Sequence, residues 1–230
     1  MKKLILLASG NGSNAERIVT YFRENGLAEV AFILTNNPKA GVIDRAQRLD
    51  VPCMLFDRKD FYETSYILDL LEREQPDLIV LAGFLWKCPE NIIARFPNRI
   101  INIHPSLLPK YGGKGMYGMH VHEAVIAAGE KESGITIHYI NEHYDEGAII
   151  YQERVAIAPT DTPESLAQKV HELEYRAFPL IIKQILQNKA INFPNYFSKK
   201  EKSFLQKQKF EDIPEIQSCI KFCKRNFYLF

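Results

Sequence analysis

The first two thirds of the chain alternate short apolar runs with longer amphipathic stretches, and no other feature limits the fold as strongly. Leu78–Ala82 is apolar at every position, which is typical of a strand covered on both faces of a sheet. Strands that alternate with helices are joined by right-handed crossovers and form a mainly parallel sheet. The sequence therefore predicts an α/β fold, an open mainly parallel sheet with helices on both faces.

The apolar runs and turn signals set the expected elements. Strands are predicted at 3–8, 30–35, 53–56, 78–82, 99–103, 135–140 and 149–156. The last two are expected to extend the sheet as an antiparallel pair. Helices are predicted at 14–25, 42–49, 62–74 and 90–96. A long helix is expected to run to about Leu186, with Asp161 as its N-cap, Pro163 in its first turn and Glu164 closing a capping box.

Composition excludes several classes of protein. The 29 basic and 28 acidic residues give a formal charge of +1, so no global field attracts nucleic acid or an anionic membrane. The four cysteines form no C-x-x-C pair, which disfavours a disulfide scaffold or thiolate zinc site and favours the cytoplasm. The apolar run Leu4–Ala8 is too short for a signal peptide, and no run approaches the ~18 apolar residues of a membrane span.

The end of the chain differs from the rest. Residues 198–230 carry eight basic and four acidic residues and end in an aromatic-rich stretch. We therefore predict one domain over 1–190 and a basic, aromatic C-terminal appendix over 191–230. The appendix is interpreted as a peripheral tail that docks on the main body, with a partner-binding or oligomerising segment as the alternative.

A glycine-containing loop lies between the first expected strand and helix. Within Ser9–Ala15, the residues Gly10, Gly12 and Ala15 fit G-x-G-x-x-G/A, in which backbone N–H groups and a helix N-terminus hold a phosphate. No carboxylate ends the second strand to bind a ribose hydroxyl. The loop is therefore a candidate phosphate site without a dinucleotide clamp, and the alternative is a tight strand-to-helix turn.

A second candidate site begins where the fifth strand ends. Asn102 and His104 are two residues apart, so their side chains project to the same face at the carboxyl end of a parallel strand. An amide beside an imidazole suits a reaction that builds charge on a carbonyl oxygen. Asp145, in the later strand connection, is expected to face them, to raise the His104 pKa and to relay a proton. The alternative is a structural histidine.

Other polar residues nearby receive plainer interpretations. Ser106 lies between Pro105 and Leu107 and is expected to bond local backbone rather than act as a nucleophile. His120 and His122 could complete a metal site on paper, but they follow a glycine-rich stretch and are interpreted as helix-cap and helix-face residues. No metal is predicted. The stretch 112–119 itself is expected to be a mobile flap over the site, or else an irregular surface loop.

These motifs together resemble the folate-dependent phosphoribosylglycinamide formyltransferases, over about residues 1–188. The resemblance is carried by Ser9–Asn14, Leu81–Phe84, Asn102–Tyr111 and Asp145–Gly147. It implies a Rossmann-like formyltransferase fold with an antiparallel C-terminal extension. It also implies transfer of a formyl group from 10-formyltetrahydrofolate, as co-substrate, to the amine of glycinamide ribonucleotide in purine biosynthesis.

The resemblance further implies roles for individual residues. The phosphate of the ribonucleotide would be held by Gly12, Ser13 and Asn14, and its ammonium group by Glu174 with His171 nearby. Asn102 and His104 would stabilise the tetrahedral oxygen, and Asp145 would help move the proton. The folate would lie against Leu85, Trp86, Lys87, Cys88, Asn102, Asn141, Glu142, His143, Tyr144 and Asp145. Trp86-Lys87 replaces a Met-Arg-Ile-like stretch that is usual in the family.

Several alternatives accompany this interpretation. A methionyl-tRNA formyltransferase would carry a larger C-terminal domain, and a formyltetrahydrofolate hydrolase an extra N-terminal domain. An enzyme acting on another acceptor and a catalytically silent nucleotide-binding module also stay open. The resemblance implies small-molecule substrates, whereas the cysteine usage and charge balance indicate a cytoplasmic location and no nucleic acid or membrane partner. A homodimer stays open.

Overall fold

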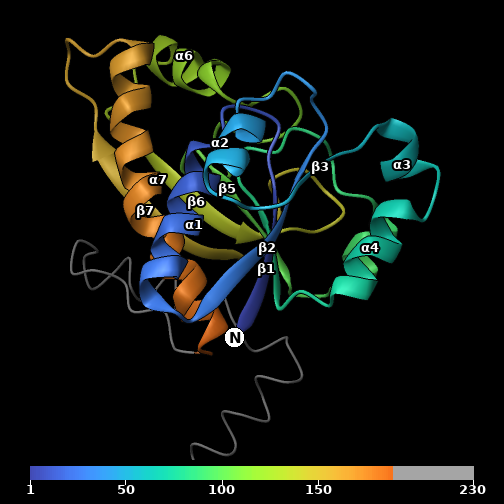
Figure 1. Ribbon diagram of the computed structural model, residues 1–230. Helices are drawn as coiled ribbons and strands as arrows, with labels where there is room; N and C mark the ends of the chain where they lie inside the picture. The colour runs from blue at the N-terminus through green and yellow to red at the C-terminus, as the bar shows by residue number, and fades with distance from the viewer. Residues whose placement is uncertain (189–230) are drawn as a thin grey trace, which may run out of the picture. The chain divides into compact units, whose positions relative to one another are not determined.

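The computed structural model describes residues Met1–Asn188, in which seven strands form one sheet of order β3-β2-β1-β4-β5-β6-β7 (Figure 1). The strands are β1 Lys2–Leu7, β2 Ala28–Thr35, β3 Cys53–Leu55, β4 Leu78–Leu81, β5 Ile100–His104, β6 Glu132–Tyr139 and β7 Ile149–Ala156. The first five pair in parallel, whereas β5–β6 and β6–β7 are antiparallel. The predicted parallel sheet and its antiparallel extension are both confirmed.

Helices cover both faces of this sheet (Figure 1). They are α1 Ser13–Asn25, α2 Val42–Arg48, α3 Arg58–Tyr62, α4 Tyr66–Glu74, α5 Glu90–Arg95, α6 Met119–Ala127 and α7 Pro163–Leu186. Leu4 and Leu6 of β1 alternate along the strand with Ile5 and Leu7, and all four side chains are buried. Ile5 and Leu7 belong to the core cluster formed with α3, α4 and α5. Because alternate residues point to opposite faces, the apolar strands imply the two helix layers.

The single helix predicted at 62–74 is wrong, because the chain forms α3 and α4 there. Asp57 accepts a hydrogen bond from the Asp60 backbone at 2.9 Å, and Asp60 accepts one from the Asp57 backbone at 3.2 Å. This capping box starts a helix four residues before the predicted one. α3 ends at Tyr62 with Glu63 as its C-cap, and the Thr64 hydroxyl accepts a hydrogen bond from the backbone of Tyr66 at the start of α4.

The N-cap predicted for the long helix is also corrected. Thr162, not Asp161, caps α7, and Ser165 rather than Glu164 completes the capping box. Asp161 instead accepts a hydrogen bond from the backbone of Ala158 at 2.7 Å and pairs with Lys169. The hydrogen bond from Lys169 is the main reason that the pKa of Asp161 falls to about 2.

The strand order marks one end of the sheet as a potential ligand-binding site. The chain moves outward from β1 to β3 and then returns to β4 on the other side of β1, so the order reverses between β1 and β4. Open α/β sheets bind ligands at the carboxyl ends of strands beside such a reversal. Here β1 leads into the glycine-containing loop and β5 ends at His104.

The predicted appendix at 191–230 lies outside the described residues. Within Met1–Asn188, no helix combines the length and apolar character that crossing a membrane requires.

Candidate active site

The loop after β1 has the geometry of an anion-binding helix start. Gly12 is the N-cap residue of α1 and has φ 76°, a left-handed conformation that favours glycine. A Cβ on Gly12 would also collide with the side chain of Val42. Ser13 and Asn14 form the first turn of α1, where backbone N–H groups are free to bind a phosphate.

Glu174 of α7 is brought to the same end of α1. The carboxylate accepts a hydrogen bond from Asn14 Nδ2 at 2.9 Å, and His171 Nδ1 lies 2.9 Å from the same oxygen. Glu174 is only 4% exposed, although an isolated helix carboxylate is usually solvated. The hydrogen bond to Glu174 raises the pKa of His171 above its ordinary value. The structure thus brings together three of the predicted substrate-binding residues.

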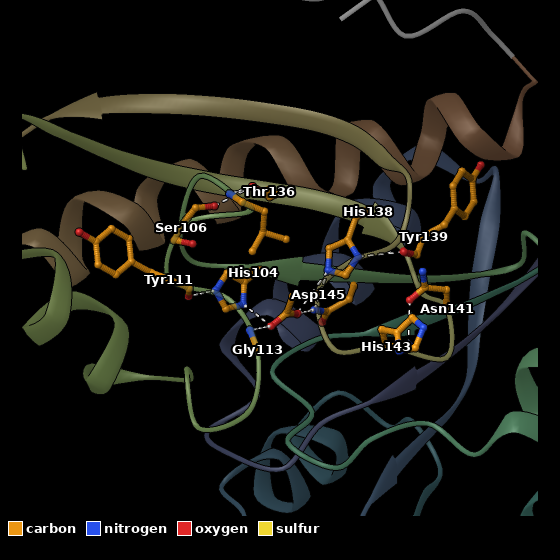
Figure 2. Close-up of polar contacts among 12 residues, drawn as sticks. His104, Ser106, Tyr111, Gly113, Thr136, His138, Tyr139, Asn141, His143 and Asp145 are labelled. Carbon is orange, nitrogen blue, oxygen red and sulfur yellow. Dashed lines mark hydrogen bonds and ion pairs between the residues drawn. The ribbon is translucent and has the colours of Figure 1, made fainter. Parts of the chain in front are cut away.

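The residues at the end of β5 converge on Asp145, which lies in the β6–β7 connection (Figure 2). His104 Nδ1 is 3.6 Å from Asp145 Oδ2, and Asn102 Nδ2 is 3.5 Å from Asp145 Oδ1. The backbone N–H of Gly113 donates to Oδ2 at 2.9 Å. The predicted juxtaposition of Asn102, His104 and Asp145 is therefore present.

His138 is a fourth member of this cluster that the sequence analysis did not identify. It lies opposite Asn102 in the antiparallel β5–β6 pair, and its Nε2 is 3.2 Å from Asn102 Nδ2 and 3.6 Å from Asp145 Oδ1. Its Nδ1 is 2.8 Å from the carbonyl oxygen of Tyr139. Figure 2 shows His104 and His138 directed at Asp145 from its two sides.

Backbone carbonyl groups determine which ring nitrogen carries hydrogen in each neutral histidine. A carbonyl only accepts, so His104 Nε2–H donates to Tyr111 O at 2.7 Å and His138 Nδ1–H donates to Tyr139 O. His104 Nδ1 is then the nitrogen that can take up a proton opposite Asp145. His138 Nε2 is an acceptor, which directs the amide nitrogen of Asn102 into the cluster.

Burial decides the charge states in this cluster. Burial lowers the pKa of His104 below 6.5, although the Asp145 carboxylate acts in the opposite direction. Asp145 thus raises the His104 pKa as expected, but the desolvation of this 4% exposed side chain outweighs that charge, so the net shift is downward. Burial tends to raise the pKa of Asp145, but the interactions with the His138 and His104 rings and the hydrogen bond from the Gly113 backbone outweigh it and hold that pKa below 3.8.

The glycine-rich stretch at 112–119 closes around Asp145. A Cβ on Gly112 would collide with the Leu108 side chain and come within 3.2 Å of Asp145 Cβ. Asp145 itself has φ 57°, so the close approach involves a left-handed residue on one side and glycine on the other. The predicted mobility of this flap is not tested by a static arrangement and stays a prediction.

Ser106 has the structural role that its sequence context indicates. Its hydroxyl donates to the carbonyl oxygen of Lys110 at 2.7 Å, which confirms the prediction of a local backbone contact. Thr136 of β6 donates to the Ser106 carbonyl at 2.7 Å and accepts from the Leu108 backbone at 3.0 Å (Figure 2). These bonds hold the segment that carries Tyr111 and so fix the partner of His104.

An aromatic cluster occupies the predicted folate side. The Trp86 ring packs against Phe56, Phe61, Tyr62 and Phe84. The guanidinium of Arg58 lies 5.5 Å from the centre of the Trp86 ring. Leu85 and Tyr144 are exposed, as are Asn141, Glu142 and His143. Cys88 differs, because its side chain lies in the core and burial raises its pKa to about 12.

The two histidines of α6 have different environments. Gly118 is the N-cap of α6, so neither histidine has the predicted capping role. His120 is exposed and lies 3.4 Å from Glu123, whereas His122 is 2% exposed and its Nδ1 has no hydrogen-bond partner. Among residues 1–188, no group of three His, Cys, Asp or Glu side chains is arranged to hold a metal ion.

The buried histidines predict how stability depends on pH. Burial lowers the pKa of His122 below 6.5. His171 and His104 also lower this pKa, whereas Glu174 raises it. As the pH drops through 6.5, the unfolded chain binds more protons at this position than the folded protein does, so the free energy of unfolding decreases as the pH decreases. We expect His122→Leu to lose less thermal stability than the wild type between pH 7.5 and 5.5, in melts at constant ionic strength. His120→Leu should keep the wild-type slope, and equal slopes in all three proteins would contradict the prediction.

The structure is a mainly parallel α/β sheet that carries an amide, two imidazoles and a carboxylate at the carboxyl ends of its strands. Comparison with known proteins identifies the class of protein that has this fold and site. Residues 2–182 match the Formyl transferase family, and the chain belongs to that family. The curated relatives include a phosphoribosylglycinamide formyltransferase of Bacillus subtilis, 38% identical over 81% of this chain and 95% of its own length. The resemblance seen in the sequence motifs is thereby confirmed.

Solved structures agree with this assignment. Phosphoribosylglycinamide formyltransferase from Anaplasma phagocytophilum is 33% identical with a TM-score of 0.74, covering 81% of this chain and 87% of that one. Glycinamide ribonucleotide transformylase 1 from Geobacillus kaustophilus is 36% identical with a TM-score of 0.74, covering 81% and 99%. This chain spans 66% of a chloroplastic phosphoribosylglycinamide formyltransferase of Arabidopsis thaliana, at 36% identity, and 62% of one of Vigna unguiculata, at 37%.

Proposed function

We propose that this chain transfers the formyl group of 10-formyltetrahydrofolate to the amine of glycinamide ribonucleotide, a step of purine biosynthesis. The observation that carries the proposal is the convergence of His104, Asn102 and His138 on the single carboxylate of Asp145. Such a cluster suits a reaction in which a carbonyl oxygen gains charge while a proton changes place. The names of the similar proteins support the choice of substrates.

The reaction forms one carbon–nitrogen bond and breaks another. The amine attacks the formyl carbon, the oxygen gains negative charge, and the bond to the folate nitrogen N10 then breaks. The bound ammonium group first releases one proton to solvent, which frees the lone pair that attacks. The attacking nitrogen then loses a second proton and N10 gains one. Asp145 accepts this second proton directly or through His104 Nδ1, and His104 passes it to N10. No covalent intermediate with the protein is needed.

Asn102 stabilises the oxygen during this exchange, and His104 joins it once Nδ1 has taken up the proton. Asn102 Nδ2 lies 3.2 Å from His138 Nε2 and 3.5 Å from Asp145 Oδ1, so one of its two hydrogens faces each of these atoms. The longer contact is the weaker one, so the hydrogen directed at Asp145 is the one released to the developing oxyanion. His138 acts as a positioning residue, because its Nε2 keeps the amide nitrogen turned toward the cluster.

The remaining predicted residues form the binding subsites. Gly12, Ser13 and Asn14 hold the phosphate at the start of α1, and Glu174 with His171 binds the ammonium group. The folate lies against 85–88 and 141–145, where exposed apolar groups adjoin the Asp145 cluster. Cys88 contributes there only through its backbone. The catalytic domain is 1–190, no metal takes part, and a cytoplasmic location follows from the scattered cysteines.

The first experiment measures release of tetrahydrofolate from 10-formyltetrahydrofolate, with and without glycinamide ribonucleotide, in EDTA throughout. We expect release that depends on the ribonucleotide and resists the chelator. Release without an acceptor would indicate a hydrolase. No release with this acceptor, together with tight binding of the ribonucleotide, would indicate a silent nucleotide-binding module.

Glu174→Ala tests the binding subsite. We expect the KM for the ribonucleotide to rise about 10–100-fold with a smaller change in kcat, because a charge-assisted hydrogen bond to the substrate is lost. Steady-state kinetics with each substrate varied in turn provide the measurement. Glu172→Ala is the matched control, since Glu172 is exposed on the same helix. A loss confined to kcat would contradict a binding role for Glu174.

A further inference from the structure

His122 is a buried polar residue to which the proposed mechanism gives no role. The side chain is 2% exposed, yet Nδ1 has no hydrogen-bond partner among the described residues. A buried ring nitrogen left unpaired costs about 1–3 kcal/mol. Native proteins keep few such groups, and each one calls for an explanation, such as a bound water or ion or a part in the chemistry of a site.

The position of His122 brings its side chain close to the proposed acceptor subsite. His122 lies on α6, which packs against α7, the helix that carries Glu174 and His171 (Figure 1). Its ring interacts electrostatically with both of these residues and with His104 of β5. It therefore lies near the proposed ammonium subsite of Glu174 and His171 and near His104 of the Asp145 cluster.

A second unpaired atom occurs beside the same carboxylate. Asn14 donates its Nδ2 to Glu174, but its Oδ1 is buried without a partner. Asn14 and His122 come from different helices, so two independent elements leave polar atoms unpaired around Glu174. Glu174 and Asn14 offer acceptors, and a ligand that fits them must donate hydrogen bonds.

We propose that His122 is a substrate-binding residue whose Nδ1 hydrogen-bonds a proton-donating group of glycinamide ribonucleotide beside Glu174. The proposal rests on the proposed function. The donor is either the glycyl amine or a ribose hydroxyl, which share this hydrogen-bonding chemistry. A neutral imidazole suits the position because it adds no positive charge beside Glu174 to compete with the substrate ammonium group.

The test compares variants of two histidines on one helix. His122→Leu removes both ring nitrogens at similar volume, and His122→Asn keeps a polar atom close to the position of Nδ1. We expect His122→Leu to raise the KM for the ribonucleotide about tenfold, the equivalent of one lost hydrogen bond, with the KM for 10-formyltetrahydrofolate unchanged. His122→Asn should recover most of the affinity. His120→Leu is the control, because the His120 side chain is 62% exposed.

Binding measured without turnover separates this inference from misfolding and from the proposed function. Calorimetric titration with glycinamide ribonucleotide alone should reproduce the KM changes, and thermal melts should show that each variant is folded. Titration with ribose 5-phosphate identifies the donor. A matching loss of affinity in His122→Leu assigns the ribose hydroxyls, and unchanged affinity assigns the glycyl amine.

Three results would overturn the inference: normal ribonucleotide affinity in a folded His122→Leu protein, an equal loss in His120→Leu, or no recovery in His122→Asn. Each assumes a wild-type enzyme that turns over with the ribonucleotide. Absence of that turnover would instead refute the proposed function.

Discussion

Replacing Asp145 by asparagine is expected to lower kcat by about 10²–10⁴-fold while the protein stays folded. The change keeps the size of the side chain but removes its charge. Gly113 N–H donates to Oδ2, so the amide oxygen of the new side chain takes that position and its nitrogen faces Asn102 Nδ2. Two donors then oppose each other. Loss of the carboxylate also lowers the His104 pKa further, because the charge of Asp145 is the main influence that raises it.

The measurement is single-turnover kinetics at saturating substrates, with thermal melts to verify the fold. Glu146→Gln is the matched control, since it removes an exposed carboxylate one residue away and should leave the rate close to normal. Turnover within tenfold of the wild type in Asp145→Asn would remove this carboxylate from the proton transfer.

Replacing His104 by alanine is expected to lower kcat by a similar factor, about 10²–10⁴-fold. The variant loses the ring nitrogen that faces Asp145 at 3.6 Å and leaves the carbonyl oxygen of Tyr111 without its donor. Because the removed ring leaves a space of its own size, added imidazole should restore part of the rate. Turnover of His104→Ala measured over a series of imidazole concentrations therefore separates a chemical role for His104 from a structural one.

His120→Ala is the control for this second experiment and should keep normal turnover and show no response to imidazole. A folded His104→Ala enzyme with a normal rate would contradict the mechanism. A slow enzyme that does not respond to imidazole, and whose ribonucleotide KM has risen in parallel, would assign His104 to binding instead.

Local sequence signals predicted most of the fold and the residues adjoining strand ends. The apolar composition of Leu78–Leu81 identifies it as a buried strand. The loop pattern identifies Gly12 as the residue at the turn into the first helix. Asn102 and His104 were placed together because a strand has a period of two. Each of these inferences needs only neighbouring residues, and the structure agrees with each.

Local signals could not predict the environment of residues that depend on contacts between segments distant in the sequence. His138 joins the site because it is opposite Asn102 in the antiparallel pair, and a shift of one residue in register would turn it to the other face. Glu174 is buried where α7 packs against other elements, including α1 and α6, which no helix pattern reveals. The low pKa of His104 likewise reflects complete packing around the ring rather than its one charged neighbour.

The aromatic cluster beside 85–88 gives the protein a built-in optical reporter. Trp86 is the only tryptophan in the chain, so indole fluorescence arises from one position at the edge where we place the folate. The Tyr62 ring centre lies 5.9 Å from that indole and the Arg58 guanidinium 5.5 Å from its centre, so the emission of Trp86 reports on a closely packed, partly charged environment. We therefore expect folate binding to change the emission of Trp86 in the unlabelled enzyme.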